Sequence, residues 1–187
     1  LHSTSRRQRQ MCIRDRDIAV DEKMQLLTHC NGDAAGDQFL DAYEKSVARY
    51  GANDNRQQLR PVMIHCQTVR DDQLERMRKL RMIASIFIGH VNYWGDVHIE
   101  NLGEVRGARI SPVKSALDKD IVVNFHTDTQ VTMPYMFHSV WAAVNRMSRQ
   151  GRILAAEECV DVWDALKAVT ILSLIHISEP TRHAQIS

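Results

Sequence analysis

The chain has 187 residues, with 24 basic and 23 acidic side chains and a formal net charge of +1. It contains no run of about 20 apolar residues, the length that crosses a membrane, so we expect no membrane partner. Its four cysteines are too few and too scattered for a disulfide framework or a C-x-x-C zinc site, which favours a reducing, cytoplasmic compartment.

Both ends of the chain have the sequence of a translated sequencing adapter. Residues 11–15 (M-C-I-R-D) and 172–177 (L-S-L-I-H-I) are what the two complementary strands of a transposase mosaic-end adapter encode. We therefore predict that residues 1–16 and 172–187 are non-biological and disordered, and that 17–171 is an internal part of a longer protein. The ends hold six basic and two acidic residues, which leaves 18 basic and 21 acidic residues between them. The arginine-rich start is then no nucleic-acid-binding arm, and we expect no nucleic-acid partner.

Four apolar runs of strand length each lead into a histidine. One such histidine would be an ordinary strand-end residue, but four in equivalent places argue for one shared site. The four runs, each with its histidine, are 24–28 with His29, 61–64 with His65, 83–88 with His90 after Gly89, and 121–125 with His126.

Amphipathic patterns of helical period lie between these runs. Asp33 is placed as the N-cap of the first helix, and Thr68 to Asp71 resembles a capping box that opens the second. The stretch from Gly89 to Arg109 is expected to be a long functional loop. The predicted helices are 34–50, 68–80, 111–117, 136–148 and 161–171.

A strand–loop–helix unit that occurs four times predicts an α/β fold with a parallel sheet. An open doubly wound sheet collects ligands at one switch point, whereas a closed barrel brings every strand end to one mouth. The converging histidines therefore favour a partial (β/α)8 TIM barrel, roughly strands five to eight with their helices. Half a barrel has two unpaired edge strands, so a homodimer that rebuilds the barrel from two copies is a partner to consider.

Imidazoles and a carboxylate at a barrel mouth are a ligand set for a divalent metal such as zinc. Asp128 closely follows a strand end that carries a histidine, and it is the best candidate for a general base that takes a proton from metal-bound water. Tyr93, Trp94 and His98 follow His90 and would form a substrate wall. The alternatives are that the two aromatic residues only cap the barrel and that His98 hydrogen-bonds within its own segment.

The chain resembles the metal-dependent amidohydrolase superfamily, in the branch of N-substituted formamide deformylase. The resemblance covers nearly all of 17–171, as the C-terminal half of the superfamily's barrel. Two departures from the branch are Arg81, where glycine is usual, and Gln130, where proline is common. The motifs that carry the resemblance are T-H-C-N-G-D-A-A (28–35), R-P-V-M-I-H-C-Q (60–67), H-V-N-Y-W-G-D-V-H (90–98), R-I-S-P (109–112), F-H-T-D-T (125–129) and W-A-A-V-N-R (141–146).

The resemblance implies a role for each matching residue. His29 and His65 fall on metal ligands, Asp128 falls on the metal-site aspartate that orients and deprotonates the attacking water, and His90 falls on a histidine that contacts substrate or oxyanion. It also implies a divalent metal, zinc above all, and a small-molecule amide substrate that is hydrolysed at a non-peptide C–N bond. The superfamily's strand-one H-x-H pair and strand-four ligand are not in this sequence. An inactive truncated fragment, or a metal-dependent lyase or isomerase on the same barrel, are the alternatives.

Overall fold

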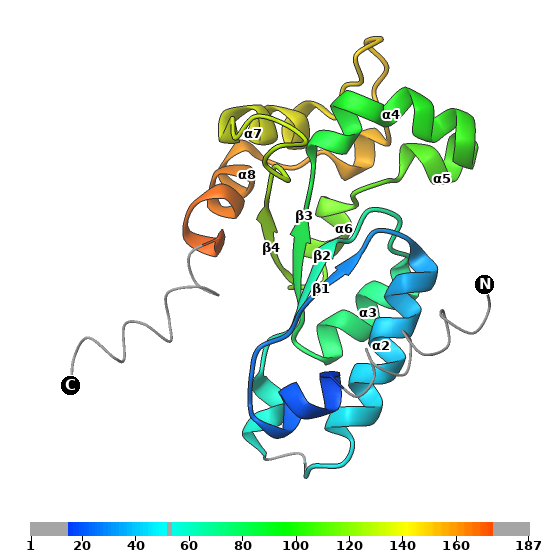
Figure 1. The fold of residues 1–187 in the computed structure, drawn as a ribbon. Helices are drawn as coiled ribbons and strands as arrows, with labels where there is room; N and C mark the ends of the chain where they lie inside the picture. Colours follow the sequence, from blue (N-terminus) through cyan, green and yellow to red (C-terminus); the bar gives the residue numbers. More distant parts are fainter. Residues whose placement is uncertain (1–14, 52–53, 174–187) are drawn as a thin grey trace.

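The computed structural model describes residues 15–51 and 54–173. Four strands form one sheet in the order β1-β2-β3-β4, and every neighbouring pair is parallel (Figure 1). The strands are β1 (Leu27–Cys30), β2 (Val62–His65), β3 (Ile83–Ile86) and β4 (Val122–Phe125). Four consecutive strand–helix units in spatial order are the arrangement of a partial (β/α)8 barrel, so the predicted fold class is confirmed.

Helices connect the strands and cover one face of the sheet. Figure 1 shows α2 and α3 side by side on this face, with α4 and α7 beyond the carboxyl ends of the strands. In the described ranges no helix is long and apolar enough to cross a membrane. The helices are α2 (Asp33–Val47), α3 (Asp71–Lys79), α4 (Gly89–Leu102), α5 (Glu104–Ala108), α6 (Val113–Leu117), α7 (Met136–Asn145) and α8 (Val162–Val169), with 3₁₀ turns η1 (Asn55–Gln58) and η2 (Ala156–Glu158).

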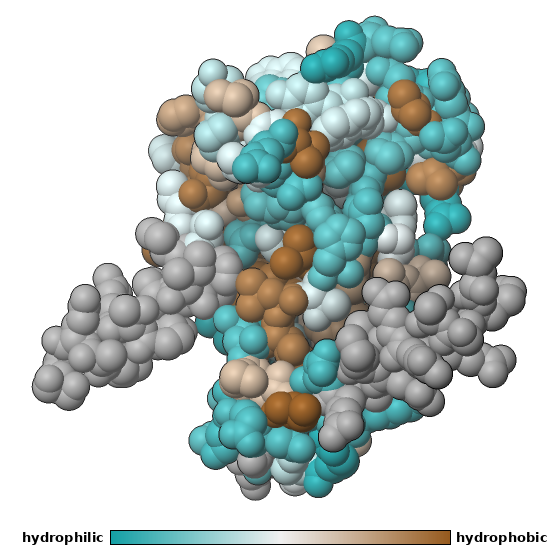
Figure 2. Space-filling model, in the orientation of Figure 1, coloured by the Kyte–Doolittle hydropathy of each residue, from teal (hydrophilic) through white to brown (hydrophobic). Residues whose placement is uncertain are grey.

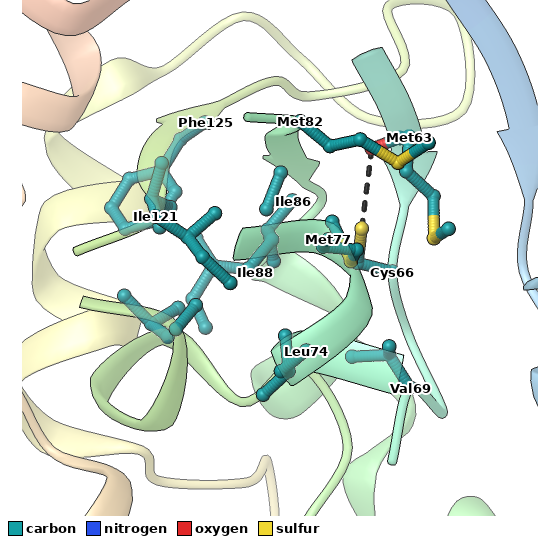
Figure 3. Packing of buried hydrophobic residues seen from close by; sticks show 14 of the residues in the cluster. Met63, Cys66, Val69, Leu74, Met77, Met82, Ile86, Ile88, Ile121 and Phe125 are labelled. Atoms are coloured by element: carbon teal, nitrogen blue, oxygen red, sulfur yellow. Dashed lines mark hydrogen bonds between the residues drawn. The ribbon is translucent and has the colours of Figure 1, made fainter. Parts of the chain in front are cut away.

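The core lies between the sheet and the helices. Strand residues such as Met63, Ile86 and Phe125 point into it and belong to the same buried cluster as Leu74 and Met77 of α3 (Figure 3). All five side chains are at most 3% exposed, and each buried side chain of this kind contributes about 1.5–3 kcal/mol to folding. The helices are therefore held to the sheet by apolar contact with one of its faces.

The opposite face of the sheet has much less cover. Leu27, whose register partner is Val62, is 56% exposed, and Ile64 and Val122 on the same face are half-buried. Figure 2 shows apolar side chains open to the surface in the middle of the molecule, where the sheet lies in Figure 1. This is the face that a closed barrel turns toward its interior, and His29 lies on it.

The expectation of a long loop from Gly89 to Arg109 is wrong. These residues form α4 and α5, and the signal was present as a spacing of four: His90, Trp94 and His98 share one side of α4. The stretch also contains glycines and two aromatic residues, which have low helix propensity. These residues made the four-residue spacing hard to recognise as a helix. Tertiary packing overrides that propensity, since α4 packs against α5 and α7.

Two expected helix caps also differ in the structure. Gly32 is the N-cap of α2, and Asp33 is its first residue; the N–H of Asp33 donates to Thr68 Oγ1 at 2.9 Å. Because Thr68 makes this contact with another segment, it does not cap a helix, and α3 begins three residues later. Its N-cap is Arg70, whose N–H donates to Gln73 Oε1 at 3.0 Å.

Substitution of Gly107 in α5 is expected to destabilise the protein. A Cβ at this position would lie 2.5 Å from the carbonyl oxygen of His98 and 2.5 Å from Ile99 Cα, so the two helices would have to separate. We expect Gly107→Ala to lower the free energy of unfolding by about 1–3 kcal/mol. Gly51→Ala is the control, because a Cβ there meets nothing within 4 Å. Urea unfolding of both variants measures the difference, and equal losses would refute the close approach of α4 and α5.

Candidate metal centre

His29 and His65 meet at the carboxyl ends of β1 and β2. Because the strands are parallel neighbours, their ends reach the same edge of the sheet, and the two imidazole rings lie with centroids 4.4 Å apart, edge to face. His29 is exposed and His65 is buried. The structure thus brings together the two histidines that the sequence predicts as metal ligands.

The backbone at the end of β2 is turned into the left-handed region. His65 has φ 76° and Cys66 has φ 48°, values that cost a non-glycine residue about 1–2 kcal/mol each. The turn interrupts the strand's alternation: the Cys66 side chain enters the core, with Sγ 3.2 Å from the Met63 carbonyl oxygen (Figure 3), while the His65 ring contacts His29. Such strain persists where surrounding structure enforces it, and it occurs often at functional positions.

A third histidine contacts His65 from the end of β4. His126 Nε2 lies 3.3 Å from His65 Nδ1, and His126 Nδ1 lies 3.0 Å from Ser85 Oγ on β3. These contacts occupy the Nδ1 atom of His65 and leave its Nε2 atom for another partner. A metal-binding histidine commonly uses its second ring nitrogen in this way, to fix the orientation of the ring.

Burial keeps these imidazoles uncharged. It lowers the pKa of His90 and of His126 to about 4, and it also lowers the pKa of His65. The exposed carboxylate of Asp128 opposes this effect at all three, so Asp128 lies near the cluster; its own backbone is left-handed, with φ 49°. A neutral imidazole is the form that binds a metal ion.

The side of α4 that carries His90 faces the same edge of the sheet. The His90 ring centroid lies 4.7 Å from that of Phe87, 5.0 Å from Trp94 and 5.6 Å from His98. Of the predicted substrate residues, Trp94 and His98 therefore lie beside His90.

Tyr93 lies toward another part of the molecule. Its ring centroid is 5.0 Å from that of His138 on α7, and the Arg149 guanidinium carbon is 4.8 Å from the ring centroid. It remains in contact with Trp94, at 5.4 Å between centroids.

Sequence reasoning missed Gln67. Its amide nitrogen contacts His90 and His98, and the side chain is 3% exposed. The only sequence signal was its place two residues after His65, in the R-P-V-M-I-H-C-Q motif.

A family model for the amidohydrolase family matches residues 16–186. The chain belongs to the amidohydrolase family. Its fold is similar to that of an uncharacterized metal-dependent hydrolase from Pyrococcus horikoshii OT3, with TM-score 0.73 and 27% identity over 89% of this chain and 32% of that one. A second, from Pyrococcus furiosus, has TM-score 0.63 and 25% identity over 81% of this chain and 29% of that one. No protein of curated function matches. The chain spans about a third of the length of these solved structures.

Membership of the amidohydrolase family confirms the superfamily expected from the motifs, while the formamide deformylase branch stays a prediction. The adapter assignment stays a prediction too. Residues 1–14 and 174–187 lie outside the described residues, and the family match extends to residue 186. Arg16 is 7% exposed, with its guanidinium carbon 5.7 Å from the Phe39 ring centroid.

The donor set of this amidohydrolase chain fits a metal in part. A zinc site needs at least three protein ligands, and His29 and His65 supply two adjacent imidazoles. Within the part of the chain that the structure describes, no three histidine, cysteine, aspartate or glutamate side chains come close enough together to hold a metal ion.

The orientation of the strand ends predicts which cysteines react. Cys30 and Cys66 neighbour the two histidines but lie in the core, and burial raises the pKa of Cys30 to about 11 and that of Cys66 above its usual value. Cys159 is only half-buried. We expect a maleimide at neutral pH to label Cys159 well before Cys30 and Cys66, as measured by peptide mass mapping.

Labelling in urea is the control for this experiment, because unfolding should make the three thiols react at similar rates. Fast native labelling of Cys30 or Cys66 would mean that the strand ends are turned the other way, with the histidines toward the core.

Proposed function

We propose that this chain forms part of a hydrolase that cleaves a non-peptide C–N bond of a small-molecule amide with metal-activated water. The observation that carries the proposal is the edge-to-face pair of His29 and His65, 4.4 Å apart at neighbouring strand ends. Membership of the amidohydrolase family and the likeness to two metal-dependent hydrolases support it.

His29 and His65 would hold the metal, with Asp128 at the same edge of the sheet. His65 would bind through Nε2, because Nδ1 is already in contact with His126. Zinc suits imidazole and carboxylate ligands, and when bound it lowers the pKa of a coordinated water to about 7 and polarises a carbonyl group. The chain's own residues then supply orientation and proton transfer.

Asp128 is the base in this proposal. It is exposed and acts electrostatically on His65, His90 and His126, so its carboxylate lies near these histidines. An ionised carboxylate can orient the attacking water, accept its proton and pass that proton to the leaving nitrogen. His90 would contact the carbonyl oxygen of the amide, and Trp94 and His98 would line the substrate wall. Tyr93 would support that wall through its contact with Trp94.

A second candidate is that this chain alone is catalytically inactive. It spans about a third of the two solved hydrolases, and the described residues supply two adjacent imidazole ligands rather than a complete site. A lyase or isomerase reaction on the same barrel would use similar metal ligands, so zinc binding does not distinguish these reactions. Turnover of an amide does distinguish them.

Zinc binding tests the ligand pair. We expect His29→Ala and His65→Ala each to weaken zinc binding to the full chain by at least about 10-fold, since each removes an imidazole from the site. Isothermal titration with zinc chloride measures the change.

His138→Ala is the matched control for the zinc experiment, because His138 is partly buried but lies against Asn92 and Trp141 instead of His29 and His65. Zinc that binds to histidines elsewhere in the chain gives the same background in all three variants. Unchanged zinc affinity in His29→Ala and His65→Ala would remove these residues as ligands.

Turnover tests the base. On a panel of N-formyl and N-acyl amines, we expect Asp128→Asn to lower kcat of the zinc-loaded protein by about 10²–10⁴-fold, because asparagine accepts no proton. Release of the free amine is measured together with the zinc content, so that loss of the base is distinguished from loss of the metal.

Asp120→Asn is the control. Both aspartates have a left-handed backbone, with φ 57° at Asp120 and 49° at Asp128. Asp120, however, precedes β4 and lies at the opposite edge of the sheet. Equal effects of the two substitutions would contradict the assignment of Asp128. No turnover by the unaltered chain on any amide would support the second candidate.

A further inference from the structure

Gln67 joins two histidines of α4 to the end of β2. Its amide nitrogen lies 2.7 Å from His98 Nε2 and 3.3 Å from His90 Nδ1. The two histidines are eight residues apart, two turns of the same helix, so one amide spans the side of α4 that faces the site. The Gln67 side chain is 3% exposed, and water has little access to compete for these contacts.

The chemistry of the amide decides the proton positions. A side-chain NH2 group has two N–H donors and no acceptor, so each ring nitrogen that it contacts must be an acceptor. A neutral imidazole carries one N–H, which must then be on the other nitrogen. His90 would carry its proton on Nε2, and His98 on Nδ1.

The backbone of Gln67 is held in place from both sides. Its carbonyl oxygen accepts from the N–H of Ser111 at 2.7 Å, and the N–H of the next residue, Thr68, donates to the Asn31 carbonyl oxygen at 3.2 Å. The amide therefore starts from a fixed position in the fold.

Ser111 is itself fixed by a buried arginine. The Arg146 side chain is 0% exposed, and its guanidinium donates to the carbonyl oxygen of Ser111 at 3.0 Å and to that of Ile110 at 2.7 Å. It also donates to the carbonyl oxygens of Leu154 and Ala108, at 2.7 and 3.1 Å. Four bonds from one rigid guanidinium hold the segment on which Gln67 rests.

We propose that Gln67 is a positioning residue that sets opposite tautomers in His90 and His98, so that His90 keeps its proton on Nε2 and is an uncharged hydrogen-bond donor. The catalytic use of that donor rests on the proposed function, in which His90 contacts the carbonyl oxygen of an amide. His98 then anchors the amide of Gln67, because its imidazole Nε2 atom accepts a hydrogen bond from that amide.

The surroundings of His90 agree with an uncharged donor. Phe87 and Trp94 pack against its ring, and burial is the main reason that its pKa is low. A fixed N–H in such an environment stabilises negative charge that develops on a carbonyl oxygen without reorganisation at the moment of reaction. A histidine with its proton on Nδ1 would present a lone pair at Nε2 and repel that charge.

The tautomers are observable by ¹⁵N NMR of the full chain labelled in histidine, metal-free and at neutral pH. The long-range proton–nitrogen pattern distinguishes the two neutral forms, and His90→Gln and His98→Gln assign the signals. We expect Nε2–H in His90 and Nδ1–H in His98. The reverse pattern would mean that the amide of Gln67 is turned over, with its oxygen accepting from both rings, and would overturn the proposal.

Gln67→Glu is the decisive variant, because a carboxylate of the same shape accepts hydrogen bonds and does not donate them. We expect both tautomers to reverse in this variant. In Gln67→Met, which has neither donor nor acceptor, each ring should show a mixture of the two forms. A role limited to packing would leave the tautomers as they are in all variants.

Gln38→Glu is the control, since it makes the same substitution at an exposed position of α2. The spectrum of the unaltered chain decides the proton positions by itself if Gln67→Glu does not fold. The measurement is also independent of turnover and of zinc. Loss of zinc binding in the His29 and His65 variants would bear on the proposed function, while a wrong tautomer at His90 would bear on Gln67 alone.

Discussion

Parallel pairing of four consecutive strands is the constraint on which the rest of the structure depends. The register pairs Cys30 with His65, His65 with Ile86, and Ile86 with Phe125, so the strands end at one level. A slip by one residue would exchange the two faces of a strand, and the apolar contacts with α2 and α3 prevent it. The residues that follow each strand, among them His90 and His126, are therefore delivered to one edge of the sheet.

At that edge, hydrogen bonds orient the histidines whose pKa values burial has lowered. Ser85, His126 and His65 form one series from β3 through β4 to β2, and Gln67 joins His90 and His98 in another. A buried polar group without a partner would cost about 1–3 kcal/mol, so each contact both stabilises the fold and fixes a ring. The two series approach each other where the His65 and His90 rings lie 6.3 Å apart.

Arg146 shows how a residue remote from the histidines can act on them. Burial lowers its pKa to about 10, and bonds to four carbonyl oxygens compensate for the lost hydration. Its carbonyl partners belong to the end of α5, the segment before α6 and the segment before η2. Through Ser111 and Gln67 this arrangement reaches α4, which explains why a motif far along the sequence bears on the geometry of the site.

The sequence by itself determined the architecture and brought two candidate ligands to neighbouring strand ends. Apolar runs of strand length, separated by helical patterns, were enough to predict a parallel sheet, because local hydrophobic period reflects which faces are buried. The same runs placed His29 and His65 at strand ends, and adjacency in a parallel sheet followed from chain order. The cap of α8 is equally local, since the Asp161 side chain accepts from the N–H of Trp163 two residues away.

Only the tertiary structure decided the features that depend on contacts between distant segments. Helix α4 forms in spite of its glycines because α5 and α7 pack against it. Thr68 bonds to Asp33 across 35 residues instead of capping its own helix, and the left-handed turn at His65 and Cys66 sends one side chain to the site and the other to the core. Gln67 looked like any polar residue after a strand, since its partners lie 23 and 31 residues further along. Side-chain hydrogen bonds over such separations have no local period, and the fold alone brings their donors and acceptors together.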